Sequence, residues 1–454
     1  SGGVVRAGDV RASIERLFRA RPPSPGTYFF EAIVGAGGCG GEPAACDLSR
    51  GIVTNDETGS VTFHLSRPDP DFLYKLSVPF ASVLPSDAPP ADMDATEPLP
   101  ATGPYVIAAY TSPAGAGGEG RLELERNPRF EEWSGAAQPD GNPDRIVWRM
   151  GVDHDQVVDL VRDGGADWMV GSPDPERLEE LRTRHADRLH EYPQPSTLGF
   201  AMNTRAPPFD DVNVRRAVNL ALDRETAAAF LGEGRITCQI LPPNYPGYRP
   251  YCPYTADAGE GAEWTGPDLA RARRLVTASG HAGAKVTVWT MAHPPPYDFE
   301  GLGKHIGDVL RELGFEVTVR VTQDVGRHFE FVANSRNRAQ IFGVGWIQDY
   351  AAASNFLDLL FSCESFVPNN PFNFNFAELC DPRIDALIDR AFELQLSDPS
   401  AAGRAWADVD RAVVDTAAWI PVANPLGVDF LSERVGNFQR HPQWGLLLGQ
   451  LWVR

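Results

Sequence analysis

Apolar and polar positions along the chain alternate in ways that predict both helices and strands. The strongest helical pattern covers residues 211–231, where Val214 and Val218 belong to one apolar stripe. Either Asp210 or Asp211 can cap the start of this helix, since an aspartate side chain accepts hydrogen bonds from the first free backbone N–H groups. A long amphipathic helix is therefore expected near the middle of the chain.

The stretch from residue 285 to residue 347 is the most informative about architecture. Its pattern predicts strands at 285–291, 315–322 and 339–347, with helices at 302–314 and 324–336 between them. Gly314 is expected to stop the first of these helices, because glycine readily adopts the left-handed conformation found beyond helix ends. This alternation predicts a parallel sheet covered by helices on both faces.

Further elements follow from the same periodicities. We expect helices at 8–20, with Asp9 available as a cap, and at 153–165, 382–394 and 401–414. We expect strands at 59–68, 145–150, 166–171, 417–431 and 447–453.

Length and charge narrow the class of protein. The chain has 454 residues, which suggests two or three domains, and its 41 basic and 61 acidic side chains leave a formal charge of -20. This balance argues against a nucleic-acid or anionic-membrane partner, since both need clustered positive charge. No apolar run is long enough to cross a bilayer, and the opening "SGGVVRAGDV" lacks the regions of a signal peptide. We expect a mature product or a piece of a longer protein.

The six cysteines fall into three pairs that are close in sequence. These pairs are Cys39 with Cys46, Cys238 with Cys252, and Cys363 with Cys380. Each pair brackets a loop rich in Gly, Pro or Asn, which favours three local disulfides and an oxidising compartment. Zinc binding is the rival interpretation, but no C-x-x-C pair occurs and no histidine stands at ligand spacing from a cysteine. Free structural cysteines remain a further alternative.

Trp346, Asp349 and Tyr350 lie within five positions where the expected strand 339–347 ends. In open parallel sheets, ligands bind beyond the carboxyl ends of strands. An aromatic face offers apolar contact, and a carboxylate can receive a ligand ammonium. The alternative is that Asp349 caps the following helix and that Trp346 belongs to the core.

Two other groups are candidates for ligand contact. Asn203 precedes the strong helix, and its alternative role is to satisfy backbone groups at a crossover between domains. Arg215 or Arg216 could pair with a ligand carboxylate, although a solvated helix face is the favoured place for these arginines. Asn373 and Phe374 belong to the segment "NNPFNFNF", which could line a cleft or could be a loop ordered by a disulfide.

Signals of catalysis and of metal binding are absent from the sequence. It contains no G-x-S-x-G, H-E-x-x-H or G-x-x-x-x-G-K-[ST] motif. The two closest histidines, His185 and His190, do not share a helical face. We expect no enzyme activity, no cofactor and no metal.

The chain resembles the extracellular solute-binding proteins of the peptide/nickel class, family 5, which deliver ligands to ABC importers. The resemblance runs nearly end to end and is carried by "GDVRASIERL", "PLPATGPYVI", "LERNPRFEEW", "NPDRIVWRM", "GFAMNTRAPPFDDVNVRRAVNLALDRE", "LPPNYPGY", "GVGWIQDY", "DPRIDALIDRA" and "AAWIPVANP". The chain departs from the family by carrying "AAAS" after "DY" and by starting after the opening segment that relatives have.

The resemblance implies an α/β, two-lobed fold of the periplasmic-binding-protein type II kind with a ligand cleft between the lobes. Lobe one would comprise 1–195 plus 424–454, and lobe two 196–423. The resemblance further implies that Asp349 receives the amino terminus of a peptide, with Trp346 and Tyr350 beside it.

The expected function is capture of a small ligand, with an oligopeptide favoured, and its delivery to an ABC permease in the membrane. The protein would be an extracytoplasmic monomer, with a lipid anchor in the full-length form as one option. Two alternatives stay open: a ligand-sensing domain of a longer regulatory protein, and an α/β hydrolase or transferase.

Overall fold

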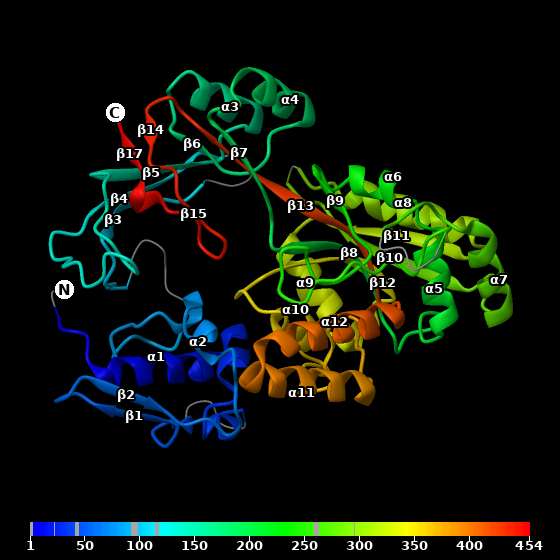
Figure 1. The fold of residues 1–454 in the computed structure, drawn as a ribbon, viewed down its shortest axis with the longest axis horizontal. Coiled ribbons are helices and arrows are strands. Elements are labelled where there is room, and N and C mark those ends of the chain that lie inside the picture. The colour runs from blue at the N-terminus through cyan, green and yellow to red at the C-terminus, as the bar shows by residue number, and fades with distance from the viewer. Residues whose placement is uncertain are drawn as a thin grey trace. The chain divides into compact units, whose positions relative to one another are not determined.

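A computed structural model describes residues 3–21, 23–40, 45–91, 99–113, 118–257, 263–294 and 296–454, without the side chains of 154 and 155. The chain divides into two compact units. The first unit comprises Ser1–Met169 with Leu431–Arg454, and the second comprises Val170–Phe430 (Figure 1). The expected lobe limits at 195/196 and 423/424 lie within the second unit and stay a prediction.

The first unit is built from short strands and a few helices. Its helices are α1 (Ala7–Arg19), α2 (Phe72–Lys75) and α3 (His154–Arg162), with 3-10 turns at Pro25–Phe30, Ala36–Gly38, Pro79–Ala81 and Leu448–Gln450. Its strands are β1 (Ile52–Asn55), β2 (Ser60–Phe63), β3 (Tyr105–Thr111), β4 (Gly120–Arg126), β5 (Arg145–Met150), β6 (Trp168–Met169), β14 (Val435–Gly436), β15 (Arg440–His441), β16 (Gly445–Leu446) and β17 (Trp452–Val453). β3, β4 and β5 form an antiparallel sheet in that order, and β1 pairs with β2.

Helix α1 begins earlier than its expected cap. The helix starts at Ala7, so Asp9 is its third residue, and the Asp9 carboxylate accepts the backbone N–H of Arg6 at 2.8 Å. Asp9 still stabilises the helix start, because a negative charge in the first turn interacts favourably with the unpaired N–H groups. The position predicted for the cap was nevertheless wrong.

The second unit carries most of the regular structure. Its helices are α4 (Pro175–Arg184), α5 (Val212–Ala221), α6 (Arg224–Ala229), α7 (Leu269–Ser279), α8 (Phe299–Glu312), α9 (Val325–Ala333), α10 (Ser354–Phe361), α11 (Pro382–Ser397) and α12 (Pro399–Asp415), with a 3-10 turn at Ser335–Asn337. Its strands are β7 (Leu189–Pro193), β8 (Ser196–Met202), β9 (Gly234–Ile236), β10 (Lys285–Met291), β11 (Glu316–Thr322), β12 (Ile341–Ile347) and β13 (Trp419–Leu431).

The sheet of the second unit is mixed. β11, β10 and β12 are parallel neighbours, as predicted, and Figure 1 shows them side by side. β8 runs antiparallel to β12, and β13 runs antiparallel to β8, β7 and β9. The parallel prediction holds only for the three strands linked by helices, because a helical crossover is what returns the chain in the same direction.

Helices cover both faces of β10, as the alternation predicted. A methyl group built on Gly303 of α8 would lie 2.6 Å from Cβ of Thr290, so α8 packs closely on the face where Thr290 points. The ring of Phe331 in α9 lies 4.3 Å from that of Trp289. Because neighbouring residues in a strand point to opposite faces, α8 and α9 lie on opposite sides of the sheet.

The strongest helical pattern proved to be two helices. Asp211 caps α5 by accepting the Asn213 N–H at 2.7 Å, as expected. The chain then turns extended at Leu222, where ψ is 122°, and Asp223 caps α6 by accepting the N–H groups of Glu225 and Thr226. The prediction of one helix over 211–231 was wrong because the second aspartate starts a new helix. No helix within the described residues is long and apolar enough to span a membrane.

Candidate functional site

The candidate site begins at the carboxyl end of β12. Trp346 is paired there with Thr197 of the neighbouring strand β8. Just beyond the strand, the backbone N–H of Gln348 donates to the carbonyl oxygen of Pro195 at 3.0 Å. Asp349 and Tyr350 follow directly, so the backbone that presents them is attached to the sheet at two points.

Asn355, in the first turn of α10, connects Trp346 to Asp349. Its Oδ1 accepts the indole N–H of Trp346 at 3.2 Å and the backbone N–H of Asp349 at 2.8 Å. Its Nδ2 donates to Oδ2 of Asp349 at 3.0 Å. Sequence reasoning missed Asn355, although an amide six residues beyond Asp349 in an apolar helix was a usable signal.

The carboxyl of Asp349 lies in a largely desolvated setting. Burial raises its pKa above the ordinary value of 3.8, and the hydrogen bond from Asn355 opposes that rise. Asp349 does not cap the following helix, because α10 begins at Ser354 with Ala353 as its N-cap residue and no side-chain cap among the described residues. A partly buried carboxylate of this kind gains from a cationic partner.

An aromatic ring from another part of the chain joins the site. The ring of Phe374 meets the indole of Trp346 edge to face, with 5.5 Å between centroids. The neighbouring Asn373 is buried instead in its own loop, where it accepts the N–H of Val367 at 3.1 Å and donates to the carbonyl of Asn375 at 2.9 Å. The structure thus brings Phe374 to Trp346, whereas Asn373 holds the loop together.

Two tyrosines lie at or close to the segment that holds Trp346 and Asp349. Tyr350 is buried, with its hydroxyl 3.3 Å from that of Ser354. Tyr245, which sequence reasoning missed, donates its hydroxyl to the side-chain oxygen of Gln348. Burial raises the pKa of the Tyr245 phenol, and the negative charge of Asp349 raises it further. The signals for Tyr245 were its place inside the loop bracketed by Cys238 and Cys252 and inside the segment "LPPNYPGY" that carries the family resemblance.

Asn203 lies in a different buried polar group. Its amide donates to the carboxylate of Glu378 at 2.8 Å, and its oxygen accepts the backbone N–H of Arg205 at 2.9 Å. Burial raises the pKa of Glu378, while Asn203 and the positive charge of Arg205 lower it. The structure places Asn203 between two loops of the second unit, and its role toward a ligand stays a prediction.

Arg215 is not on a solvated helix face, so that expectation was wrong. Its side chain is only 6% exposed and donates to the carbonyl oxygens of Phe209 at 2.7 Å and Thr416 at 2.9 Å. These carbonyls belong to the turn that leads into α5 and to Thr416, the C-cap residue of α12, and the guanidinium supplies the donors that they need. Arg216 is half-buried and donates to the carbonyl of Asp415 at 3.2 Å.

The three predicted disulfides are present in the structure. They join Cys39 to Cys46, Cys238 to Cys252 and Cys363 to Cys380. No cluster of three or more His, Cys, Asp or Glu side chains suited to a metal ion occurs in the described part of the chain.

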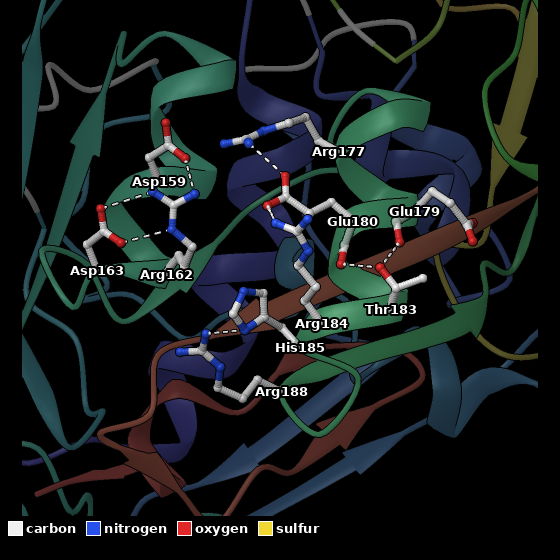
Figure 2. A network of polar contacts seen from close by, with 10 residues as sticks. All are labelled: Asp159, Arg162, Asp163, Arg177, Glu179, Glu180, Thr183, Arg184, His185 and Arg188. Atoms are coloured by element: carbon white, nitrogen blue, oxygen red, sulfur yellow. Dashed lines mark hydrogen bonds and ion pairs between the residues drawn. The ribbon is translucent and has the colours of Figure 1, made fainter.

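Charged side chains on helices α3 and α4 form local networks within each helix and the residues that follow it. Figure 2 shows Arg162 between Asp159 and Asp163 at the end of α3, and, on α4, Arg177 and Arg184 around Glu180. In the same view His185 contacts the guanidinium of Arg188 at 2.9 Å, and Thr183 donates to the carbonyl of Glu179. The more exposed of these ion pairs, such as Arg162 with Asp163, contribute little to stability.

Comparison with known proteins places the chain among binding proteins. A "Probable di/tripeptide-binding protein 5" of Pseudomonas aeruginosa is 27% identical over 394 residues, which is 83% of this chain and 67% of that protein. The solved structure of "Clavulanic acid biosynthesis oligopeptide binding protein 2" has a TM-score of 0.82 and 24% identity, and the match covers 100% of this chain and 81% of the other. An ABC transporter-associated periplasmic binding protein from Helicobacter pylori, solved with the peptide STSA, has a TM-score of 0.71 at 19% identity, over 99% of this chain and 81% of the other.

These likenesses confirm the α/β, two-lobed fold that the sequence resemblance implied. The family model described as "Bacterial extracellular solute-binding proteins, family 5 Middle" matches residues 1–367. That match spans most of the 454 residues. The chain therefore belongs to family 5 of the bacterial extracellular solute-binding proteins.

Proposed function

We propose that this chain binds short peptides by their amino terminus at the end of β12 and passes them to an ABC importer. The observation that carries the proposal is the desolvated carboxylate of Asp349, which Asn355 connects to the indole of Trp346. The family and the printed names of the peptide-binding relatives support this ligand class.

Binding of an ammonium group at Asp349 follows from the electrostatics of the site. Burial disfavours the charged carboxylate, and a peptide ammonium would offset that cost by a charge-assisted hydrogen bond. The edge-to-face pair of Trp346 and Phe374 offers apolar surface to the first residue of the peptide. Recognition of the peptide's amino terminus, with aromatic contact to its first side chain, tolerates many peptide sequences. This tolerance suits a protein that carries varied peptides.

The same electrostatics predict how binding depends on pH. Because the pKa of free Asp349 is raised above 3.8, protonation competes with the ligand at a higher pH than for an ordinary aspartate. Affinity is therefore full above the raised pKa and falls as the pH drops through it. A bound ammonium favours the ionised form and lowers this pKa.

The proposal includes a location and a partner. Three disulfides fit an oxidising compartment outside the cytoplasm, where the protein would act as a monomer and dock on a membrane permease. A lipid anchor in the full-length protein would keep it near the membrane. We propose a carrier without catalytic turnover, which agrees with the absence of catalytic motifs from the sequence.

The first experiment is native mass spectrometry of the purified chain, before and after mild unfolding, to identify co-purified small molecules. A heterogeneous set of short peptides supports the proposal. One discrete molecule without an amino group would contradict the role of Asp349, while keeping the chain a binding protein.

Calorimetry then tests the residue itself with a matched pair of peptides. We expect a dipeptide with a free amino group to bind, its N-acetylated form to bind poorly, and Asp349→Asn to weaken binding of the free peptide by about 2 to 5 kcal/mol. Asp389→Asn, which alters an exposed carboxylate on α11, is the control and should bind as the wild type does. Equal affinity of D349N and wild type for the free peptide would overturn the proposal.

A further inference from the structure

We propose that Asn355 is the positioning residue of this site, holding the carboxylate of Asp349 and the indole of Trp346 in one fixed arrangement for the ligand. The inference rests on the proposed function and adds to it a residue that need not touch the ligand. Asn355 acts through its two neighbours.

The hydrogen bonds of Asn355 determine the orientation of its amide. Its Oδ1 faces two N–H donors, the backbone of Asp349 and the indole of Trp346, at 2.8 and 3.2 Å. Its Nδ2 faces an acceptor, Oδ2 of Asp349, at 3.0 Å. A flipped amide would put N–H groups against both donors and an oxygen against the carboxylate, so only one orientation satisfies all three contacts.

The place of Asn355 in the fold makes it rigid. The side chain is 0% exposed, and the residue follows the first residue of α10. Its backbone N–H donates to the carbonyl of Ala352 at 3.1 Å. Its neighbours Phe356 and Leu357 are also fully buried, which anchors this turn of the helix. A site held by a packed helix is more precise than one held by a loop.

The shared oxygen couples the two functional side chains. Because the indole N–H of Trp346 and the backbone N–H of Asp349 meet on one atom, neither group can shift without losing part of the common contact. The third bond orients the carboxylate and stabilises its charged form, opposing the effect of burial. The phenol of Tyr245, on the loop between Cys238 and Cys252, also interacts with the charge of Asp349. Asn355 thus orients the carboxylate of Asp349 and favours its charged form.

Two substitutions separate positioning from simple packing. Asn355→Asp keeps the shape and the shared acceptor, but replaces the donor to Asp349 with a second carboxyl oxygen about 3 Å away. Asn355→Leu keeps the volume and removes all three hydrogen bonds. The matched control is Asn219→Asp, at another buried asparagine of the second unit, whose Oδ1 accepts from Arg224. Its Nδ2 donates to the carbonyl oxygens of Arg215 and Trp419, so this substitution also replaces a buried amide donor with a carboxyl oxygen, but without contact to Asp349.

The pH profile of peptide affinity is the decisive measurement. Two carboxyl groups in contact titrate as a pair, so N355D should show affinity that keeps rising with pH through a second, higher apparent pKa, a feature absent from wild type and N219D. N355L should bind the free peptide about 10- to 100-fold more weakly, because three partly buried polar groups of Trp346 and Asp349 lose their partner. The N-acetylated peptide should show neither change.

The outcomes distinguish this inference from the proposed function. If D349N binds as the wild type does, the proposed function and the role of Asn355 both fail. If D349N loses binding while N355D keeps the wild-type pH profile, only the role of Asn355 is overturned. Thermal unfolding of each variant accompanies the titrations, and if N355L does not fold, the profile of the isosteric N355D decides alone.

Discussion

The strongest prediction on stability concerns Asp410, a carboxylate in the interior of the second unit. Asp410 lies on α12 and is 0% exposed. Its Oδ2 accepts from the side-chain amide of Gln239 at 2.8 Å, and its Oδ1 accepts the backbone N–H of Ile240 at 3.2 Å. No basic side chain forms an ion pair with it among the residues that the structure describes. Such a charge is held by neutral donors alone.

Burial raises the pKa of Asp410 from 3.8 to about 7, although the hydrogen bonds from Gln239 and Ile240 oppose this rise. The folded protein therefore binds more protons than the unfolded chain between these two pKa values. The contribution of Asp410 to stability is most favourable below 3.8 and decreases as the pH rises toward about 7. A shift of this size corresponds to about 4 kcal/mol at alkaline pH, at about 1.4 kcal/mol for each unit.

Asp410→Asn removes the titrating carboxyl group. It also loses the hydrogen bond from Gln239, because the new amide N–H groups face the amide donor of Gln239. Linkage predicts that, from about pH 5 to about pH 8.5, the wild type loses about 3 kcal/mol of unfolding free energy relative to D410N. Urea denaturation of both proteins at the two pH values measures this change, because effects of other titrating groups cancel in the difference. D389N provides the control for an exposed carboxylate. A difference between D410N and wild type that does not vary with pH would refute the reasoning.

Two further substitutions test the disulfides and the packing of the sheet. Replacing Cys238 and Cys252 by alanine should lower the unfolding free energy by about 3 kcal/mol, because the disulfide closes a loop between residues 14 positions apart and so restricts the unfolded chain. An unchanged denaturation midpoint would contradict this prediction. Gly303→Ala should lower the unfolding free energy by about 1 to 3 kcal/mol, because the added methyl group overlaps Thr290. Lys304→Ala, at an exposed neighbouring position, is the control, and thermal unfolding measures both variants. Equal melting temperatures of the two variants would contradict this prediction.

Elements with one clear period and one clear boundary were predictable from the sequence. The strands expected at 145–150 and 285–291 match β5 and β10 residue for residue. Gly314, with φ of 94°, follows α8 as the expected stop. In these cases the apolar pattern, the local propensity and the terminating residue all indicate the same structure, so tertiary packing has nothing to override.

Elements were mispredicted where a polar residue had two possible uses. Asp223 continues the helical pattern after residue 221 but also accepts the next two N–H groups as a cap, and in the structure it acts as the cap. Arg215 fits a solvated face, yet it donates to the carbonyl oxygen of Phe209 just before α5 and to that of the distant Thr416. Periodicity records whether a residue is polar, but not which distant backbone groups need its hydrogen bonds.

The candidate site divides in the same way between local and distant contributions. Trp346 and Asp349 could be nominated from sequence because the end of a strand predicts where its side chains gather. Phe374 and Tyr245 reach this segment from loops about thirty and about one hundred positions away along the printed sequence, and both loops are closed by disulfides. The local half of the site carries the charge and the indole, whereas the distant half supplies the second aromatic ring and the phenol. If the two halves act together, opening the bond between Cys238 and Cys252 should weaken peptide binding as well as stability, while Asp349 keeps its contact with Asn355.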